Sequence, residues 1–201
     1  MARLGGKFFT NQVTMKTLAL AIGIWLALLG TAVAQCSDGK TANQLPLRVT
    51  NPDPADRQAI MDLIHSYNWA LDDKNVEDFK ELFTNDVTYE ACRGGGLEQI
   101  FTTKGREPLG SYINGLFIDL TNNGIRTRHI EGNTLLHVRD NDTVEGKTTL
   151  LVSIQRDASA NVPEFDYTAH LKATFKREGE FWRFSKLTLI TDTPEFQERA
   201  R

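Results

Sequence analysis

Four long segments of strand character, separated by short turns, occupy the second half of this 201-residue chain. They run over residues 125–139, 143–156, 165–177 and 181–191. Two of the connections are short polar turns, and the longer one spans residues 158–163. Long strands joined in this way predict an antiparallel meander, which determines about half of the fold.

The first half has a different pattern, because its apolar residues recur at helical spacing. Asp53 fits an N-cap and Pro54 fits the first position of a helix. The apolar positions of this helix are Ile60, Leu63, Ile64, Tyr67, Ala70 and Leu71. Further helices are predicted over residues 76–83, capped by Asn75, and over residues 108–120, with short strands over residues 86–91 and 98–103.

Helices that precede an antiparallel meander predict an α+β domain in which three helices pack on one sheet. Long strands twist strongly, so the sheet can curl around the helices and leave a pocket between the two layers. The chain contains no internal repeat and no low-complexity run. We therefore predict a single folded domain with an internal pocket.

The N-terminal 34 residues have the composition of a secretion signal. Three basic residues precede an apolar run over residues 18–29, which ends in the small-residue triplet Ala32-Val33-Ala34. This combination is typical of a signal peptide, and the run is shorter than the roughly 20 residues of a membrane span. We expect cleavage after Ala34 and export to the periplasm or the extracellular space. A lipid anchor on Cys36 is the alternative, although Gln35 departs from the small residue that such processing favours.

The chain is therefore divided into a signal peptide (residues 1–34), a polar tether (35–52), the α+β domain (53–193) and a polar C-terminal tail (194–201). Removal of the signal changes the formal net charge from −3 to −6, since the signal carries three basic residues and no acidic one. A negatively charged surface repels phosphate backbones and anionic lipids. We expect no nucleic-acid partner, and no membrane partner once the signal is removed.

Cys36 and Cys92 are the only cysteines in the chain. An oxidising compartment would allow them to pair, and two unpaired thiols are the alternative. The sequence contains no CxxC motif, no cluster of His and Cys at zinc spacing and no glycine-rich nucleotide fingerprint. The triplet Gly94-Gly95-Gly96 lacks the Lys-Ser/Thr pair of a phosphate loop. We therefore predict neither a metal nor a cofactor.

Two residues near predicted element ends are candidates for acid–base chemistry. Asp72 falls where the first helix ends, and there a carboxylate opposes the helix dipole, although Asp72-Asp73 also fits an ordinary turn. His129 lies early in the first long strand, where alternation places it on the same face as Thr127. Gly132 follows closely and favours a β-bulge, a device common near functional sites. A purely structural histidine is the alternative for His129.

Two tyrosines are candidates for hydrogen bonding inside the domain. Tyr67 lies on the apolar stripe of the first helix, so its ring points inward and its hydroxyl needs a partner. Tyr89 lies in the middle of the short strand over residues 86–91. Both also fit ordinary core positions. Tyr67 and Asp72 are about 140° apart on an ideal helix, so we expect both to reach one cavity only if the helix ends near Leu71.

Several of these stretches resemble the SnoaL-like branch of the nuclear transport factor 2 (NTF2) superfamily. The matching stretches are Ile60-Met-Asp-Leu-Ile-His-Ser-Tyr-Asn-Trp-Ala-Leu-Asp72, residues 79–89, Arg126-Thr-Arg-His129 and Phe181-Trp-Arg-Phe184. The resemblance covers about residues 53–193. It implies a cone-shaped fold in which a curved antiparallel or mixed sheet wraps around three helices and encloses a deep apolar pocket.

Within that superfamily the chain resembles scytalone dehydratase, hexachlorocyclohexane dehydrochlorinase and the bile-acid dehydratases. These enzymes pair an Asp at the end of the first helix with a His on the first long strand, and the matching positions are Asp72 and His129. Tyr67 matches a tyrosine of the bile-acid enzymes, and Tyr89 matches a strand tyrosine of the scytalone enzyme. Trp69, within the first motif, is a candidate contact to the substrate.

The chain also departs from the scytalone enzyme at several positions. Leu71 replaces a tyrosine, and Ile154 falls where a second histidine is found. Ala169 and Leu171 fall where that enzyme has a Ser/Asn pair. The resemblance therefore implies the general chemistry of these enzymes and not that particular substrate.

Residues and resemblance together predict a cofactor-independent lyase or isomerase that acts on a small apolar or cyclic substrate. His129 would remove a proton from carbon, Asp72 would orient the imidazole, and a tyrosine would stabilise the developing negative charge. Dehydratase, dehydrohalogenase and double-bond isomerase all fit this chemistry. The alternatives are an exported, non-catalytic protein that binds a small apolar or aromatic ligand, and an assembly module. A homodimer or homotrimer is compatible with each hypothesis.

Overall fold

The structure is a computed structural model that describes residues 36, 45, 48–93, 98–156 and 162–192. The predicted signal peptide, most of the tether and the C-terminal tail lie outside the described residues. The elements in chain order are α2 (Pro54–Asp72), α3 (Val76–Glu81), β1 (Phe83–Arg93), β2 (Glu98–Lys104), α4 (Arg106–Asn122), β3 (Arg126–Asp140), β4 (Thr143–Gln155), β5 (Glu164–Glu178) and β6 (Phe181–Thr191).

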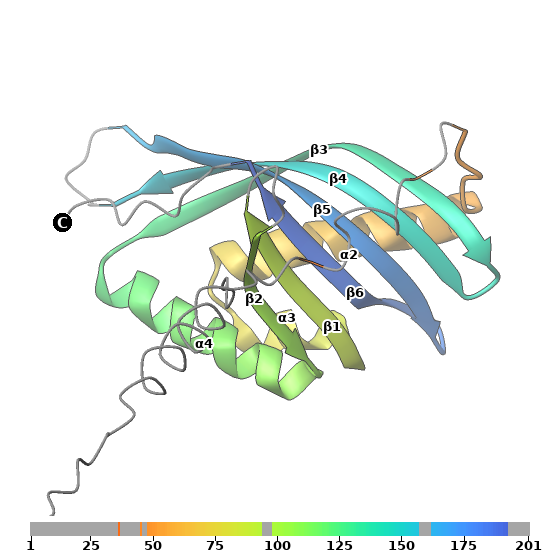
Figure 1. The fold of residues 1–201 in the computed structure, drawn as a ribbon, viewed down its shortest axis with the longest axis horizontal. Helices are drawn as coiled ribbons and strands as arrows, with labels where there is room; N and C mark the ends of the chain where they lie inside the picture. The colour runs from red at the N-terminus through yellow and green to blue at the C-terminus, as the bar shows by residue number, and fades with distance from the viewer. Residues whose placement is uncertain (1–35, 37–44, 46–47, 94–97, 157–161, 193–201) are drawn as a thin grey trace, which may run out of the picture. The chain divides into compact units, whose positions relative to one another are not determined.

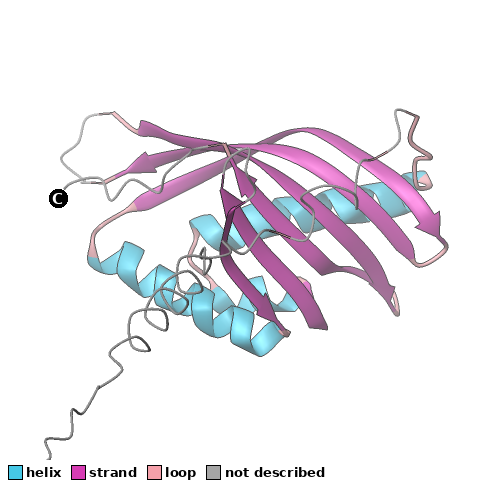
Figure 2. Cartoon of the chain, in the orientation of Figure 1, coloured by secondary structure: helices cyan, strands magenta, loops and turns pink. Residues whose placement is uncertain are grey.

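The six strands form one mixed sheet in the order β2-β1-β6-β5-β4-β3. All neighbouring strands are antiparallel except β1 and β6, which pair in parallel. The long strands β3, β4 and β5 arch over α2, whereas β1 and β2 lie beside α3 and α4 (Figure 1). Figure 2 shows the three helices gathered on one side of the curved sheet. The predicted α+β class and the sheet wrapped around helices are confirmed.

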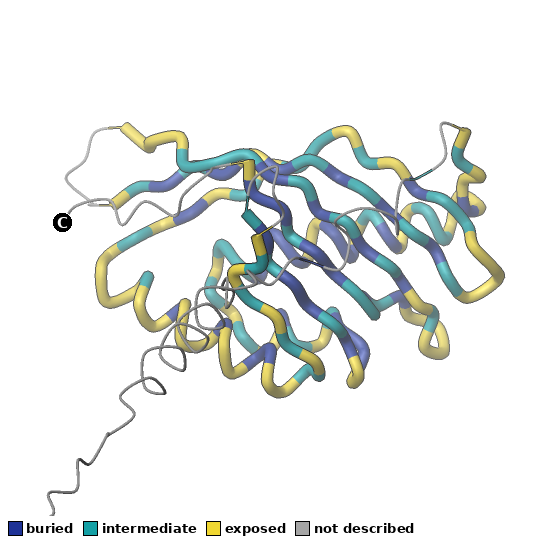
Figure 3. Tube along the Cα trace, viewed as in Figure 1, coloured by how far each residue is buried: buried dark blue, intermediate teal, exposed yellow. Residues whose placement is uncertain are grey.

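The apolar stripe of α2 forms the centre of the core, as its spacing predicts. Asp53 caps the helix by accepting a hydrogen bond from the Asp56 backbone N–H at 3.0 Å. The predicted stripe residues Ile60, Leu63, Ile64, Tyr67 and Ala70 are all buried. Buried positions alternate with partly buried ones along β4 and β5, two of the strands that cover this stripe (Figure 3). The core therefore lies between α2 and the concave face of the sheet.

The boundary between α3 and β1 differs from the prediction. The helix ends at Glu81 and β1 begins at Phe83, although the spacing of apolar residues predicts a helix as far as Phe83. The reason for this difference is a tertiary contact between β1 and β6. Phe83 pairs with Phe184 of β6, and the Phe184 N–H donates to the Leu82 carbonyl at 2.9 Å. Pairing with β6 therefore overrides the local helical pattern at this point.

Strand β3 contains the bulge that Gly132 predicts. Gly132 pairs with Thr149 and Leu135 pairs with Lys147, so β3 has one residue more than β4 between these two pairs. Asn133, the residue after Gly132, adopts the left-handed conformation with φ 54°. Thr127 is buried before the bulge and Leu136 after it. The bulge therefore changes which alternate residues of β3 face the helices.

Cys36 and Cys92 are joined by a disulfide with a Cα–Cα separation of 6.2 Å. Both residues are buried and pack with Ile190 of β6. The bond fixes Cys36 to the strand β1, 56 residues further along the chain. Among the helices that the structure describes, none is both long and apolar enough to span a membrane.

Candidate active site

The end of α2 touches the beginning of β3 through Asp72 and His129. The His129 ring nitrogen Nδ1 lies 2.6 Å from Asp72 Oδ1, and the His129 backbone N–H donates to Asp72 Oδ2 at 3.0 Å. The hydroxyl of Thr127 donates to Asp72 Oδ1 at 3.0 Å. Only 5% of the Asp72 side chain and 9% of the His129 side chain are exposed. Asp72 is therefore a nearly buried carboxylate that receives three hydrogen bonds from β3.

These hydrogen bonds determine the charge of Asp72 and the tautomer of His129. Burial alone would raise the pKa of the Asp72 carboxyl, but the hydrogen bonds and charge of His129 and the hydroxyl of Thr127 hold that pKa below its usual range. An ionised carboxylate can only accept hydrogen bonds, so Nδ1 of His129 must donate. In the neutral imidazole the proton is then absent from Nε2, which is able to accept one.

His129 lines an apolar cavity of about 330 Å³ between the helices and the sheet. Most of its wall consists of aliphatic and aromatic side chains, with a few polar groups among them. The polar residues in the wall are Tyr67, Tyr89, Tyr112, Thr127, His129, Asp166, Tyr167 and Thr191. A volume of this size and a mainly apolar lining are typical of small-molecule sites.

Tyr67 and Tyr89 meet in the wall of the same cavity, with their hydroxyl oxygens 3.2 Å apart. Burial, together with the neighbouring Tyr89 and Tyr167, raises the pKa of Tyr67 well above its usual value. Burial also raises the pKa of Tyr89, to about 12. Both phenols are therefore protonated at neutral pH. One hydroxyl proton forms the hydrogen bond between the two oxygens, and the other hydroxyl proton is available for a hydrogen bond to a ligand.

Asp72 itself does not line the cavity, because it lies behind the ring of His129. Helix α2 continues to Asp72 and is capped by Asp73. Because the helix extends to Asp72, the side chains of Tyr67 and Asp72 are about 140° apart around its axis, as expected on an ideal helix. Tyr67 reaches the cavity from the helix, whereas Asp72 contacts two residues of the cavity wall, His129 and Thr127.

Trp69 lies outside the cavity, which corrects the position predicted for it. Its side chain is 61% exposed, and it does not belong to the cavity lining. Trp69 follows Tyr67 by two residues, and a helix rotates by roughly 200° over that distance. The inward direction of Tyr67 therefore turns Trp69 toward solvent, and we remove Trp69 from the candidate site.

Sequence reasoning missed two neighbouring residues of β5 that line the cavity, Asp166 and Tyr167. Burial, with the nearby groups Tyr89, Asp166 and Asp72, raises the pKa of Tyr167. Tyr167 lies two residues before the buried Ala169 and four before the buried Leu171. Strand alternation in the sequence therefore predicts that Tyr167 faces the helices. Asp166 has no such signal, because strand alternation places it on the opposite face.

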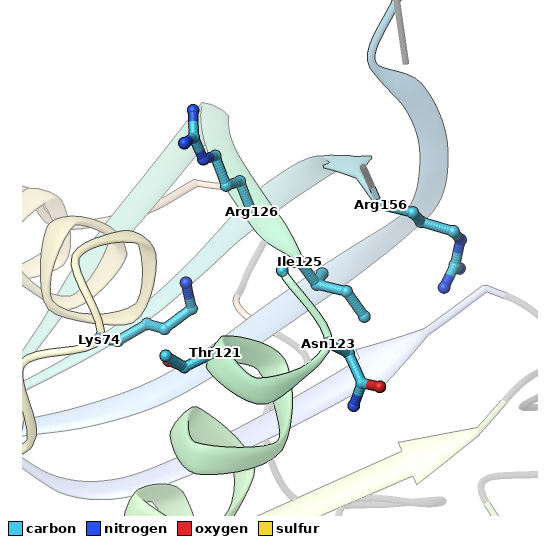
Figure 4. Close-up of a pocket in the computed structure, with 7 residues that line it drawn as sticks. Lys74, Thr121, Asn123, Ile125, Arg126 and Arg156 are labelled. Atoms are coloured by element: carbon cyan, nitrogen blue, oxygen red, sulfur yellow. The ribbon is translucent and has the colours of Figure 1, made fainter. Parts of the chain in front are cut away.

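A second hollow of about 520 Å³ lies at the turn between α4 and β3. It is lined by Lys74, Thr121, Asn123, Gly124, Ile125, Arg126 and Arg156. Figure 4 shows the guanidinium groups of Arg126 and Arg156 pointing away from each other. The cationic groups therefore do not converge on one point. This hollow also lacks the mainly apolar lining of the cavity at His129.

The hydrogen bonds of Asp72 predict a pH-dependent contribution to stability. Asp72→Asn should lower the free energy of unfolding at pH 7 by about 1–3 kcal/mol, because the variant leaves buried donors of β3 poorly matched. The folded pKa of Asp72 lies below the unfolded value of roughly 3.9. Its contribution is therefore complete above that unfolded value and is lost as the pH falls through the folded value.

Urea unfolding of wild type and variant at pH 7 and at pH 3 measures this difference. We expect the gap between the two proteins to shrink at pH 3. Asp73→Asn is the matched control, since it removes an exposed carboxylate from the same helix end and should change stability by less than about 0.5 kcal/mol. A gap of equal size at both pH values would contradict the assignment of an ionised Asp72.

Residues 53–188 match the family model of the SnoaL-like domain, which is more than half of the chain. Three solved structures show the same fold. LinA is 23% identical, with 71% of this chain and 91% of that chain covered and a TM-score of 0.55. A candidate scytalone dehydratase from Novosphingobium aromaticivorans is 17% identical, with 68% and 84% covered and a TM-score of 0.54. A protein from Catenulispora acidiphila, in complex with S-DNPA, is 15% identical, with 69% and 94% covered and a TM-score of 0.56.

No curated protein matches the sequence. The solved structures establish the architecture, which is the NTF2-like, cystatin-like fold. The complex with S-DNPA is an example of a protein of this fold that binds a small molecule. From the matched residues and the shared architecture, the chain belongs to the SnoaL-like domain family of the NTF2-like superfamily.

Proposed function

We propose that the protein is a lyase or isomerase that removes a proton from a carbon atom of a small cyclic substrate, with His129 as the base and Asp72 as its orienting carboxylate. One observation carries the proposal: the 2.6 Å contact between Asp72 Oδ1 and His129 Nδ1 lies at the wall of an apolar cavity. A neutral histidine whose Nδ1–H is held by a carboxylate presents the lone pair of Nε2 as a proton acceptor.

The first step is a proton transfer from carbon to nitrogen. Nε2 of His129 takes a proton from the carbon next to a carbonyl group, and the electron pair of the broken C–H bond moves into the enolate. The imidazolium that forms is stabilised by the negative charge of Asp72. Asp72 stays ionised throughout, which agrees with the lowered pKa of its carboxyl.

The second step decides the reaction class. If the β-carbon carries a leaving group, the enolate re-forms the carbonyl, a C=C bond forms and the leaving group departs. A hydroxide leaving group takes the proton from His129 and leaves as water, which makes the enzyme a dehydratase. If the substrate instead has a C=C bond next to the deprotonated carbon, the anion is a dienolate. His129 then returns the proton to the far carbon of that bond while the double bond shifts into conjugation with the carbonyl group, which makes the enzyme an isomerase. These steps use only side chains of the cavity and the substrate.

The paired tyrosines are suited to stabilise the enolate oxygen. The Tyr67–Tyr89 pair keeps one hydroxyl proton that is not used between them, and it can donate this proton in a hydrogen bond to a carbonyl. A donor aimed at an oxygen on which negative charge develops is most effective in an apolar site. The cavity wall that contains the pair is mainly apolar and includes Leu150, Val152 and Leu189 from the sheet.

The size and lining of the cavity support a substrate of one or two rings. The candidate scytalone dehydratase and the S-DNPA complex share the fold and support small-molecule chemistry in such a cavity. A non-catalytic ligand-binding protein or an assembly module is the second candidate. Those functions do not require a carboxylate that is buried against an imidazole. In this protein Asp72 is buried against His129, and the His129 side chain is 91% covered and lines the cavity.

We also propose that the protein acts after export. The disulfide between Cys36 and Cys92 supports this proposal, because such bonds persist mainly in oxidising compartments. The expected signal peptide ends at Ala34, two residues before Cys36. Mass spectrometry of the protein recovered from the producing cell should give a chain that begins at Gln35. A full-length chain recovered from the cytoplasm would contradict the proposal.

Hydrogen–deuterium exchange of a ketone tests the proton transfer without a leaving group. We expect the purified protein in D₂O to accelerate exchange at the α-carbon of 1-tetralone above the buffer rate, as followed by NMR. His129→Ala should reduce the enzymatic rate by about 10²–10⁴-fold, since that is the usual contribution of a general base. Asp72→Asn should also reduce it, because the amide no longer favours the Nδ1–H tautomer.

His137→Ala is the matched control, since His137 lies on the same strand and accepts a hydrogen bond from the Thr50 backbone N–H instead of lining the cavity. Its exchange rate should equal that of the wild type. Equal rates in the wild type, His129→Ala and Asp72→Asn would remove both residues from the mechanism.

A further inference from the structure

Three residues of the cavity wall form a row across neighbouring strands of the sheet. His129 of β3 pairs with Val152 of β4, and Val152 pairs with Tyr167 of β5. All three line the cavity, so their side chains project from the same face of the sheet. Neighbouring strands lie about 4.8 Å apart, so the Cα atoms of His129 and Tyr167 are separated by roughly 10 Å. The imidazole and a phenol therefore lie on opposite sides of Val152.

Tyr167 is the first residue of β5 in the register that continues along the strand. Before it the register changes, since Ser153 of β4 pairs with Phe165 and β5 has one residue more than β4 at this point. Such a bulge redirects the side chains beside it, and bulges are common next to functional sites. The regular register places Tyr167 on the inner face, together with the buried Ala169.

Tyr167 also lies between His129 and the tyrosine pair in the order of the strands. β5 is separated from β3 by β4, and from β1, which carries Tyr89, by β6. Burial raises the pKa of Tyr167, and the neighbouring Tyr89 adds to this effect. Burial likewise raises the pKa of Tyr67, with contributions from Tyr89 and Tyr167. The three phenols therefore form one cluster in the cavity wall, and Tyr167 is its member in the same row as the base.

The hydroxyl of Tyr167 is suited to donate a hydrogen bond into the cavity. Its raised pKa keeps it protonated at neutral pH. Tyr67 and Tyr89 use one proton in the bond between their oxygens. Among the residues that the structure describes, none is hydrogen-bonded to the Tyr167 hydroxyl. A phenol donates one hydrogen bond, so this proton is available to a ligand.

We propose that Tyr167 donates a hydrogen bond to the carbonyl oxygen of the substrate and stabilises the negative charge that this oxygen gains in the enolate. The inference rests on the proposed function and adds a residue to it. The spare proton of the Tyr67–Tyr89 pair and the proton of Tyr167 then act on one oxygen. No proton is transferred to that oxygen: the C–H proton moves to His129, the electron pair moves into the enolate, and Tyr167 keeps its own proton.

The row also predicts how the substrate lies in the cavity. The carbon that loses its proton faces His129, the adjacent carbonyl oxygen faces Tyr167, and the ring lies over Val152. Leu150 and Ile154, the neighbouring inner residues of β4, give this part of the wall an aliphatic surface. A donor has its largest effect in such a site when it points at an oxygen on which charge develops. Tyr167 should therefore influence the rate more than the binding of the ketone.

Tyr167→Phe tests this assignment, because it removes the hydroxyl and keeps the ring. We expect kcat for deuterium exchange at the α-carbon of 1-tetralone to fall by about 10²-fold, the usual effect of removing one such donor. KM should change by less than about tenfold, since a hydrogen bond to a neutral carbonyl is weaker than one to a charged oxygen. Initial exchange rates followed by NMR at several concentrations of 1-tetralone separate the two constants.

A second measurement tests the donor without turnover. 1-Naphthol carries its oxygen on the carbon that bears the enolate oxygen of 1-tetralone, so its phenolate imitates the enolate. The ionisation of bound 1-naphthol can be followed by the absorbance of the naphtholate at wavelengths beyond the tyrosine bands. We expect bound 1-naphthol to ionise at a pH higher by about one unit or more in Tyr167→Phe than in the wild type, because the variant lacks a donor to the phenolate.

Thr168→Val is the matched control for both measurements. Thr168 is the next residue of β5, and its hydroxyl donates to Asp192 Oδ2 at 2.6 Å instead of lining the cavity. The variant also removes one hydroxyl from the strand, but on the other face of the sheet. Its kcat and the ionisation of bound 1-naphthol should equal those of the wild type. Thermal unfolding of each variant shows whether the fold is retained.

A kcat that is equal in the wild type and in Tyr167→Phe overturns the inference and leaves the roles of His129 and Asp72 intact. A kcat that falls equally in Tyr167→Phe and Thr168→Val also overturns it, because the effect would then belong to the strand. Absence of exchange in the wild type, combined with an ionisation of 1-naphthol that depends on Tyr167, would overturn the proton transfer and retain Tyr167 as a donor. Absence of both effects would overturn both proposals.

Discussion

The hydrogen bonds between Asp72 and strand β3 join the two layers of the domain at the point where the cavity is formed. Asp72 lies at the C-terminal end of α2, where the helix dipole disfavours a negative charge by roughly 0.3–1 kcal/mol. Three donors from β3 offset this cost: the ring and backbone N–H groups of His129 and the hydroxyl of Thr127. The contact therefore serves two purposes, since the bonds that dock the helix also set the tautomer of the imidazole.

The other end of α2 is held in a similar way. Asp56, in the first turn, accepts a hydrogen bond from Trp182 Nε1 at 3.0 Å and pairs with Arg177, whose guanidinium lies 4.6 Å from the centre of the Trp182 ring. An aspartate at each end thus ties the helix to the sheet. Rotation of α2 about its axis is thereby restricted, and Tyr67 is held within hydrogen-bonding distance of Tyr89. The polar groups of the cavity are therefore held in fixed positions. Preorganised catalysis requires such fixed groups.

Residues whose role depends on local periodicity were predictable from the sequence. The stripe of α2, the inward direction of Tyr67 and the shared face of Thr127 and His129 all follow from the repeat of a helix or a strand. The pairing of Asp72 with His129 came from the family resemblance, because no local rule links residues 57 positions apart.

Features that depend on pairing between strands were not predictable in the same way. The start of β1 at Phe83 depends on Phe184, about a hundred residues further along the chain. The inward direction of Asp166 depends on a bulge, and a bulge is defined only relative to the neighbouring strand. Trp69 shows a different error: it was a candidate because it lies within the first matching motif, but its side chain points to solvent, whereas that of Tyr67 points inward.

The most direct test of the central claim is the tautomer of the neutral His129 ring, read from ¹⁵N chemical shifts of the imidazole nitrogens in labelled protein. The contact with an ionised Asp72 requires a proton on Nδ1 and none on Nε2. Shifts of that pattern, lost in Asp72→Asn, are the result that we expect. A neutral ring that carries its proton on Nε2 would contradict the claim, because the base would then be unable to accept a proton from a ligand in the cavity.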